Sequence, residues 1–148
     1  MHNTLAASDY GLLDQNTFEP RPNYGATLLW SHLMGTTVLD PQISVAANTY
    51  LYAQCLKGHR GGVTLLIVNA DRQRRFELNL PTSSERYTLT AEKLQDTTVE
   101  LNGKPLEPTS SGDLPRFGDE PVKAGRVNIM PTSITFLSIS KAGNANCQ

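Results

Sequence analysis

The sequence contains no run of about twenty apolar residues, which a membrane-spanning helix requires, so no transmembrane segment is expected. It contains no excess of charge of either sign, because 13 Lys and Arg residues stand against 14 Asp and Glu residues. Nucleic-acid-binding domains are usually basic, so we expect no nucleic-acid partner. Cysteine occurs only twice and tryptophan once. Two cysteines are too few for a disulfide-dense scaffold.

The two cysteines, Cys55 and Cys147, match no zinc-ligand spacing, and we expect neither a metal site nor a cofactor. Cys55 falls in an expected strand and Cys147 in the tail. Composition alone leaves two alternatives open, which are a bonded pair and two unrelated thiols.

The first residues also lack a feature. Met1 is not followed by a charged segment and an apolar segment, so no signal peptide is predicted. Residues 2–5 resemble the middle of a chain, and we hypothesise that Met1 is an internal methionine.

The N-terminal quarter has the local pattern of a barrel. A small-residue segment leads to Asp9-Tyr10-Gly11, a loop with Pro20 and Pro22 follows, and a helix is expected over residues 23–34. A strand end that delivers an aromatic and a carboxylate, followed by a loop and a helix, is typical of a (β/α)8 barrel, whose active site lies on such loops. We therefore predict that residues 1–35 are the last strand-loop-helix of a catalytic barrel whose remainder is absent.

The expected helix has recognisable ends. Asn23 can cap its first turn, and Gly35 is placed to end it. Trp30 and His32 on this helix are interpreted as packing residues rather than ligands.

From Thr36 onward, short β-branched or alternating runs separated by turn residues predict an antiparallel β-sandwich over residues 36–148. Asn102-Gly103 predicts a hairpin with a type I′ turn. The proline-rich stretch 105–125 is expected to be a surface meander. The expected strands cover residues 36–39, 43–56, 62–70, 75–80, 86–91, 98–101, 126–129 and 133–140.

Two of these strands are apolar on both faces, at residues 63–68 and 134–139. A strand of this kind needs cover on its outer side, since large exposed apolar patches are unusual on soluble monomers. We expect a large body to dock there, and the missing part of the parent domain is the obvious candidate.

An ordered set of motifs resembles glycoside hydrolase family 79, the heparanase and β-glucuronidase family. The N-terminal stretch resembles the end of that family's catalytic barrel, and the later motifs resemble its C-terminal sandwich, so the resemblance covers nearly the whole chain. The matching segments are Ser8-Asp9-Tyr10, Leu12-Leu13-Asp14, residues 20–24 and 33–38, Tyr52-Ala53-Gln54-Cys55, residues 99–103 and 130–136, and Cys147.

The resemblance implies two catalytic glutamates on earlier barrel strands, which this sequence does not contain. A retaining glycosidase needs two carboxyl groups about 5–5.5 Å apart. Asp9, Asp14 and Glu19 are the carboxylates near the expected strand end, and none matches a family catalytic position. We therefore assign no catalytic residue in this chain.

The resemblance does suggest substrate contacts. Tyr10 matches a tyrosine beside the catalytic centre, whose phenol can bond a sugar hydroxyl or the uronate carboxylate. Ser8 stands where the family has a glycine, and Asp9 where it has an asparagine. The alternative for Tyr10 is a core aromatic that closes the barrel.

The same resemblance implies a Cys55–Cys147 disulfide, because heparanase-like members pair the corresponding cysteines. A disulfide in turn implies an oxidising compartment, and so a secreted, extracellular or periplasmic protein.

The resulting prediction is the C-terminal segment of a glycoside hydrolase that acts on β-glucuronides or uronic-acid glycans, with the sandwich bracing the remaining barrel. The alternative is a non-catalytic β-sandwich that binds carbohydrate or is purely structural. Tyr50 and Tyr52 share a strand face, and either form a small sugar platform or pack against the barrel.

Overall fold

A computed structural model describes residues 5–6, 10–107 and 117–148. In these ranges one helix, α1 (Pro22–Leu33), precedes ten strands. The strands are β1 (Met34–Leu39), β2 (Thr49–Leu56), β3 (Val63–Asn69), β4 (Phe76–Leu80), β5 (Ser84–Thr90), β6 (Glu100–Leu101), β7 (Lys104–Pro105), β8 (Glu120–Val122), β9 (Gly125–Ile129) and β10 (Ser133–Ile139).

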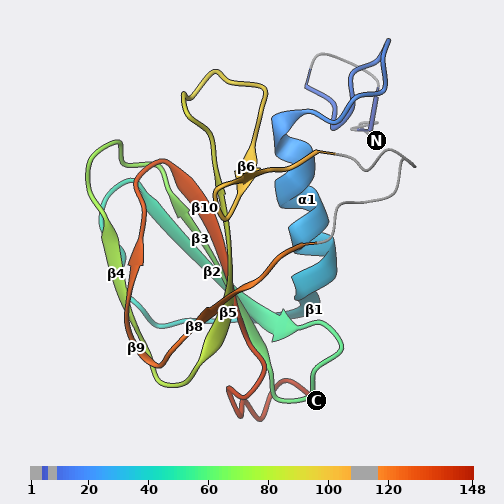
Figure 1. Ribbon diagram of the computed structural model, residues 1–148. Coiled ribbons are helices and arrows are strands. Elements are labelled where there is room, and N and C mark those ends of the chain that lie inside the picture. Colours follow the sequence, from blue (N-terminus) through green and yellow to red (C-terminus); the bar gives the residue numbers. More distant parts are fainter. Residues whose placement is uncertain (1–4, 7–9, 108–116) are drawn as a thin grey trace.

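The strands form two sheets in which every pairing is antiparallel. The larger sheet has the order β1-β2-β3-β10-β5-β6-β7, with β8 also paired to β5, and β4 and β9 form a second sheet. Figure 1 shows the β4–β9 sheet on one side of the larger sheet and α1 on the other. The prediction of a mostly antiparallel β protein with one short helix is confirmed.

Each face of the larger sheet has its own apolar core. The core beneath β4 and β9 includes Ile67 and Leu137, both fully buried. The core beneath α1 includes Leu29 at 0% exposed and Phe136 at 1%. The expectation that an outside body covers the second face was wrong for the central strands, because α1 of the same chain covers it.

Helix α1 ends differently from the prediction. It begins at Pro22, with Arg21 as an N-cap whose side chain makes no capping hydrogen bond, and it runs directly into β1. Residues of the sheet and of the turn after β2 bond to carbonyls at its end. The backbone N–H of Lys57 and the hydroxyl of Thr64 donate to the carbonyl of Leu33, and the Lys57 ammonium donates to the carbonyl of Ser31. With these partners the helix needs no glycine cap.

Gly35 therefore has another role, within β1. A Cβ atom added at Gly35 would lie 2.6 Å from the backbone oxygen of Cys55 on β2. No ordinary side chain fits at that distance, so the glycine allows β1 and β2 to approach each other at this point.

The predicted hairpin at residues 102–103 is present, and Asn102 does more than turn the chain. Asn102 and Gly103 both have positive φ, at 50° and 74°, as a type I′ turn requires. The Asn102 amide also accepts from the Thr88 N–H at 2.8 Å and donates to the carbonyls of Arg86 and Gly118. These bonds fix the hairpin to β5.

A second asparagine, Asn69, joins the two sheets. Its side chain is buried, at 1% exposed. The Asn69 amide donates to the carbonyls of Arg74 at 2.9 Å and Met130 at 3.0 Å, and its oxygen accepts from the N–H of Asp71. One buried amide thus holds the turn after β3 to the end of β9.

Some expected elements shifted. β2 begins at Thr49 rather than at residue 43, and β8 lies inside the stretch expected to be a meander. Residues 108–116 of that stretch lie outside the described residues. On α1, His32 is exposed but packs edge-on against the ring of Phe117, and Trp30 remains 41% exposed.

Candidate functional site

The loop that precedes α1 is built around Asp14. Its carboxylate accepts the backbone N–H groups of Asn16 at 2.8 Å and Thr17 at 3.1 Å. It also pairs with the guanidinium of Arg21 at 3.2 Å. Backbone bonds from Asp14 N–H to the carbonyl of Glu19, and from Arg21 N–H to Leu12, close the loop into a small hairpin.

This bonding determines the chemistry of Asp14. The two backbone N–H groups, followed by the nearby charge of Arg21, hold the pKa of Asp14 below its ordinary value. A carboxylate that is ionised and already bonded on both oxygens is unsuited to donate a proton to a leaving group. Asp14 is therefore a structural residue of the loop.

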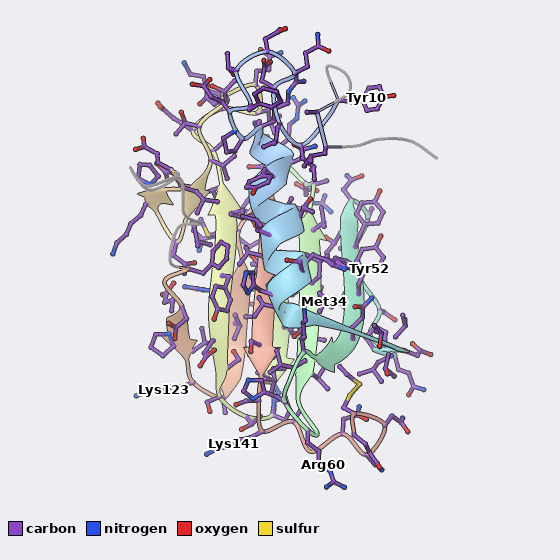
Figure 2. The ribbon with its side chains drawn as sticks, turned by 90° about the vertical axis from the view of Figure 1, so that its right-hand side faces the viewer. Tyr10, Met34, Tyr52, Arg60, Lys123 and Lys141 are labelled. Carbon is purple, nitrogen blue, oxygen red and sulfur yellow. A yellow bond between two sulfur atoms is a disulfide. The ribbon has the colours of Figure 1, made fainter. Side chains whose placement is uncertain are left out.

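A hollow of about 690 Å³ lies along this loop. Tyr10 borders it, with a side chain that is 63% exposed and that Figure 2 shows pointing away from the sheets. Within the described residues Tyr10 is thus not a core aromatic. The lining comprises Tyr10, Gly11, Asp14, Asn16, Thr17, Glu19, Pro20, Arg21, Pro22, Asn23 and Thr97.

Of the three residues predicted to contact substrate, Tyr10 is among the described residues and lies in a turn. Ser8 and Asp9 lie outside the described residues. Arg21 and Thr97, which were not predicted, also line the hollow. Arg21 lies in the Pro20-Arg21-Pro22 motif, whereas no local signal connects Thr97 to a loop more than seventy residues earlier.

The predicted disulfide is present. Cys55 on β2 is bonded to Cys147 in the tail, with their Cα atoms 5.2 Å apart. Figure 2 shows Tyr10 at one end of the molecule and the disulfide at the other. The bond therefore bears on stability and compartment, not on the chemistry of the hollow.

The described residues contain no cluster of three or more His, Cys, Asp or Glu side chains arranged to hold a metal ion. Their single helix is also too short and too polar to cross a membrane.

Comparison with known proteins identifies the family, although no family model matches the sequence. The chain is 35% identical to baicalin-β-D-glucuronidase of Scutellaria baicalensis, in an alignment that covers 92% of this chain and 27% of that protein. It is 32% identical to heparanase-like protein 1 of Arabidopsis thaliana, in an alignment that covers 97% of this chain and 34% of that protein. The chain belongs to glycoside hydrolase family 79.

A third member of the family is hyaluronoglucuronidase of Hirudo nipponia, which is 29% identical over 98% of this chain and 32% of its own length. The chain thus spans about a third of the length of the curated relatives that it matches. The family 79 resemblance read from the motifs is confirmed.

Proposed function

We propose that this chain is the C-terminal segment of a family 79 glycoside hydrolase that acts on β-glucuronides or uronic-acid-containing glycans. The observation that carries the proposal is a sequence similarity that extends over nearly the whole chain. The matching segment makes up about a third of the length of a protein named as a β-D-glucuronidase and of one named as a hyaluronoglucuronidase. In this proposal the rest of the parent enzyme supplies the two catalytic glutamates, and this chain alone is inactive.

The architecture of α1 supports a bracing role for the sandwich. Residues 1–35 would be the last strand-loop-helix of the barrel, and residues 36–148 the sandwich domain. Leu29 of α1 is fully buried against the larger sheet, and α1 continues into β1 without a loop. A barrel that contains α1 would therefore be held against the sheet through a shared helix.

Tyr10 is proposed to contact substrate, with Ser8 and Asp9 beside it. The exposed phenol of Tyr10 borders a hollow that also presents the side chain of Arg21. A phenol hydroxyl can donate to a sugar hydroxyl or to the uronate carboxylate. The carboxylate of Asp9 would repel a uronate unless a cation lies between them.

The Cys55–Cys147 disulfide supports an oxidising location, and we propose that the parent is secreted, extracellular or periplasmic.

A hybrid enzyme tests the proposal. The part of baicalin-β-D-glucuronidase that aligns with this chain is replaced by residues 1–148, and hydrolysis of baicalin is measured. We expect the hybrid enzyme to be soluble and active, because the two segments are 35% identical over 92% of this chain. Residues 1–148 alone should show no hydrolysis of an aryl β-glucuronide above buffer. Turnover by the isolated chain, or an inactive hybrid enzyme, would contradict the proposal.

The role of Tyr10 is tested by Tyr10→Phe in the hybrid enzyme. The change removes one hydrogen bond and keeps the ring, so we expect kcat/KM to fall about ten-fold, in line with about 0.5–1.5 kcal/mol for a neutral partner and more for a charged one. The melting temperature should not change, since the ring is exposed. The matched control is Tyr24→Phe, on α1 outside the lining of the hollow. Unchanged kcat/KM for Tyr10→Phe would show that the hydroxyl does not bind substrate.

One observation favours the alternative of a carbohydrate-binding module. Tyr50 and Tyr52, two residues apart on β2, are 53% and 50% exposed. Exposed aromatic side chains can stack on sugar rings. Retention of the isolated chain on immobilised hyaluronan, lost in Tyr52→Ala, would support this alternative.

A further inference from the structure

Tyr50 and Tyr52 lie on the same side of the larger sheet as α1. Residues two apart in a strand face the same way, and Tyr52 pairs with Leu66 on β3. Leu66 belongs to the core beneath α1. Both tyrosines are therefore on the helix-covered face, yet each is half exposed, so α1 does not extend over this part of the sheet. Figure 2 shows Tyr52 beside α1 rather than beneath it.

Val38 and Trp30 extend the same surface. Val38 pairs with Gln54, which lies on the Tyr52 side of β2, and Val38 is 74% exposed. On α1, Trp30 lies about 200° around the helix axis from His32. His32 packs on Phe117, and the neighbouring Gly118 is bonded to Asn102 of the hairpin beside β5, so Trp30 lies on the side of α1 that is away from β5. We name Trp30, Val38, Tyr50 and Tyr52 the tyrosine flank.

Charge is almost absent from the strands of this surface. Residues 35–56 contain one charged residue, Asp40, whereas 22 residues with the chain's average of 18% would contain about four. β1 is the edge strand of the larger sheet, and its sequence MGTTVL has no charge. Edge strands that face water usually carry charged residues, lysine above all, which prevent pairing with other chains. This edge has no such protection.

The outer face of the β4–β9 sheet, by comparison, carries polar and charged side chains. It presents Glu77, Asn79, Arg126 and Asn128, with Arg126 and Glu77 paired at 3.6 Å. The loop after β1 differs from it, because Ile43 and Val45 are 40% and 38% exposed. The apolar character thus continues from the tyrosine flank into this loop.

We propose that the tyrosine flank is the surface on which the catalytic remainder of the parent polypeptide docks. The inference rests on the proposed function, and it names the side chains that make the contact. A partner of sufficient size is expected, because the chain covers 27–34% of its relatives. In that proposal α1 belongs to the barrel, so the barrel lies on the α1 side of the sheet, next to the flank. A sugar is a poorer fit, because Val38, Ile43 and Val45 offer its hydroxyls no partner.

The test introduces Val38→Lys and Tyr52→Lys separately, both in the isolated chain and in the hybrid enzyme. In the isolated chain both side chains are exposed, so we expect the melting temperature to shift by no more than about 2 °C. In the hybrid enzyme a buried lysine should lower the yield of soluble, active enzyme at least about ten-fold. Met130→Lys is the matched control, because Met130 is 43% exposed at the end of β9 and lies outside the flank. It should leave both measurements unchanged.

The outcomes separate the two proposals. If the hybrid enzyme is active and both lysine variants retain full yield and activity, the docking surface is overturned and the proposed function remains. If the unsubstituted hybrid enzyme does not fold, both are overturned. Hyaluronan binding by the isolated chain, lost in Tyr52→Lys, would make the flank a glycan site. A dimer of the isolated chain, abolished by Val38→Lys, would make it a self-association surface. Either of the last two results also overturns the inference.

Discussion

Loss of the Cys55–Cys147 disulfide is expected to lower the free energy of unfolding by about 2–5 kcal/mol. The bond joins residues 92 positions apart, and the strands β3 to β10 lie between them. In the chain-entropy model a loop of this length corresponds to about 4–5 kcal/mol, since the cross-link removes many conformations from the unfolded chain. Cys147 also packs in the core beneath β4 and β9, at 3% exposed.

The measurement is thermal or urea unfolding of the native protein and of a Cys55→Ala/Cys147→Ala variant. Alanine avoids burying a new polar group at position 147. Dithiothreitol should destabilise the native protein and leave the double variant unchanged, which serves as the control for effects of the reductant itself. Equal stability of the two proteins, or two freely alkylated thiols in the unreduced native protein, would contradict the prediction.

Asn69→Asp is expected to destabilise the protein by about 3–5 kcal/mol at pH 7. The change removes buried hydrogen bonds and places an unpaired charge in the interior. The amide nitrogen of Asn69 donates to the carbonyls of Arg74 and Met130, and an aspartate oxygen at that position would face them with no proton to share. The adjacent Asp71, whose own pKa is lowered chiefly by the N–H groups of Gln73 and Arg74, adds a like charge.

The pH dependence of this variant has a definite sign. Burial and the neighbouring carbonyls raise the pKa of an aspartic acid at position 69 in the folded state above about 3.9 in the unfolded state. The folded state then binds more protons, so the variant loses stability as pH rises through the raised folded-state pKa. The part of the loss that comes from the charge is regained as pH falls toward about 4, and is fully regained below the unfolded-state pKa.

Asn69→Ala and Asn79→Asp provide the controls for this experiment. Asn69→Ala loses the same hydrogen bonds without adding a charge, and should show the pH dependence of the native protein. Asn79→Asp, on the exposed face of β4, should change stability by less than about 0.5 kcal/mol. An Asn69→Asp variant as stable as native protein at pH 7 would show that the amide bonds contribute little.

The sequence predicted the elements that depend on local pattern. The type I′ turn followed from Asn102-Gly103, because both positions need positive φ. The burial of β3 and β10 on both faces followed from apolar residues on both faces of their sequences. The Cys55–Cys147 pair came from family resemblance, since nothing local connects cysteines 92 positions apart.

What the sequence missed depends on contacts between distant segments. Gly35 looked like a helix terminator, but its absent side chain makes room for the Cys55 carbonyl, which no local pattern reveals. The cover over Phe136 was assigned to a missing body, because an apolar strand face shows that a partner is needed without showing which one. The sequence did not reveal that the side-chain amides of Asn69 and Asn102 bond separate segments to each other. An asparagine near a turn gives the same sequence pattern whether or not its amide is buried.

The uninterrupted passage from α1 into β1 has a consequence for how this sandwich can move between proteins in evolution. A gene segment that encoded only residues 36–148 would leave behind Leu29, and with it the cover of Leu66, Tyr87 and Phe136. The inherited unit must therefore begin no later than Pro22, where the helix starts. Helix and sheet are expected to be gained, lost and recombined together, even though the proposed boundary after residue 35 would assign the helix to the preceding domain.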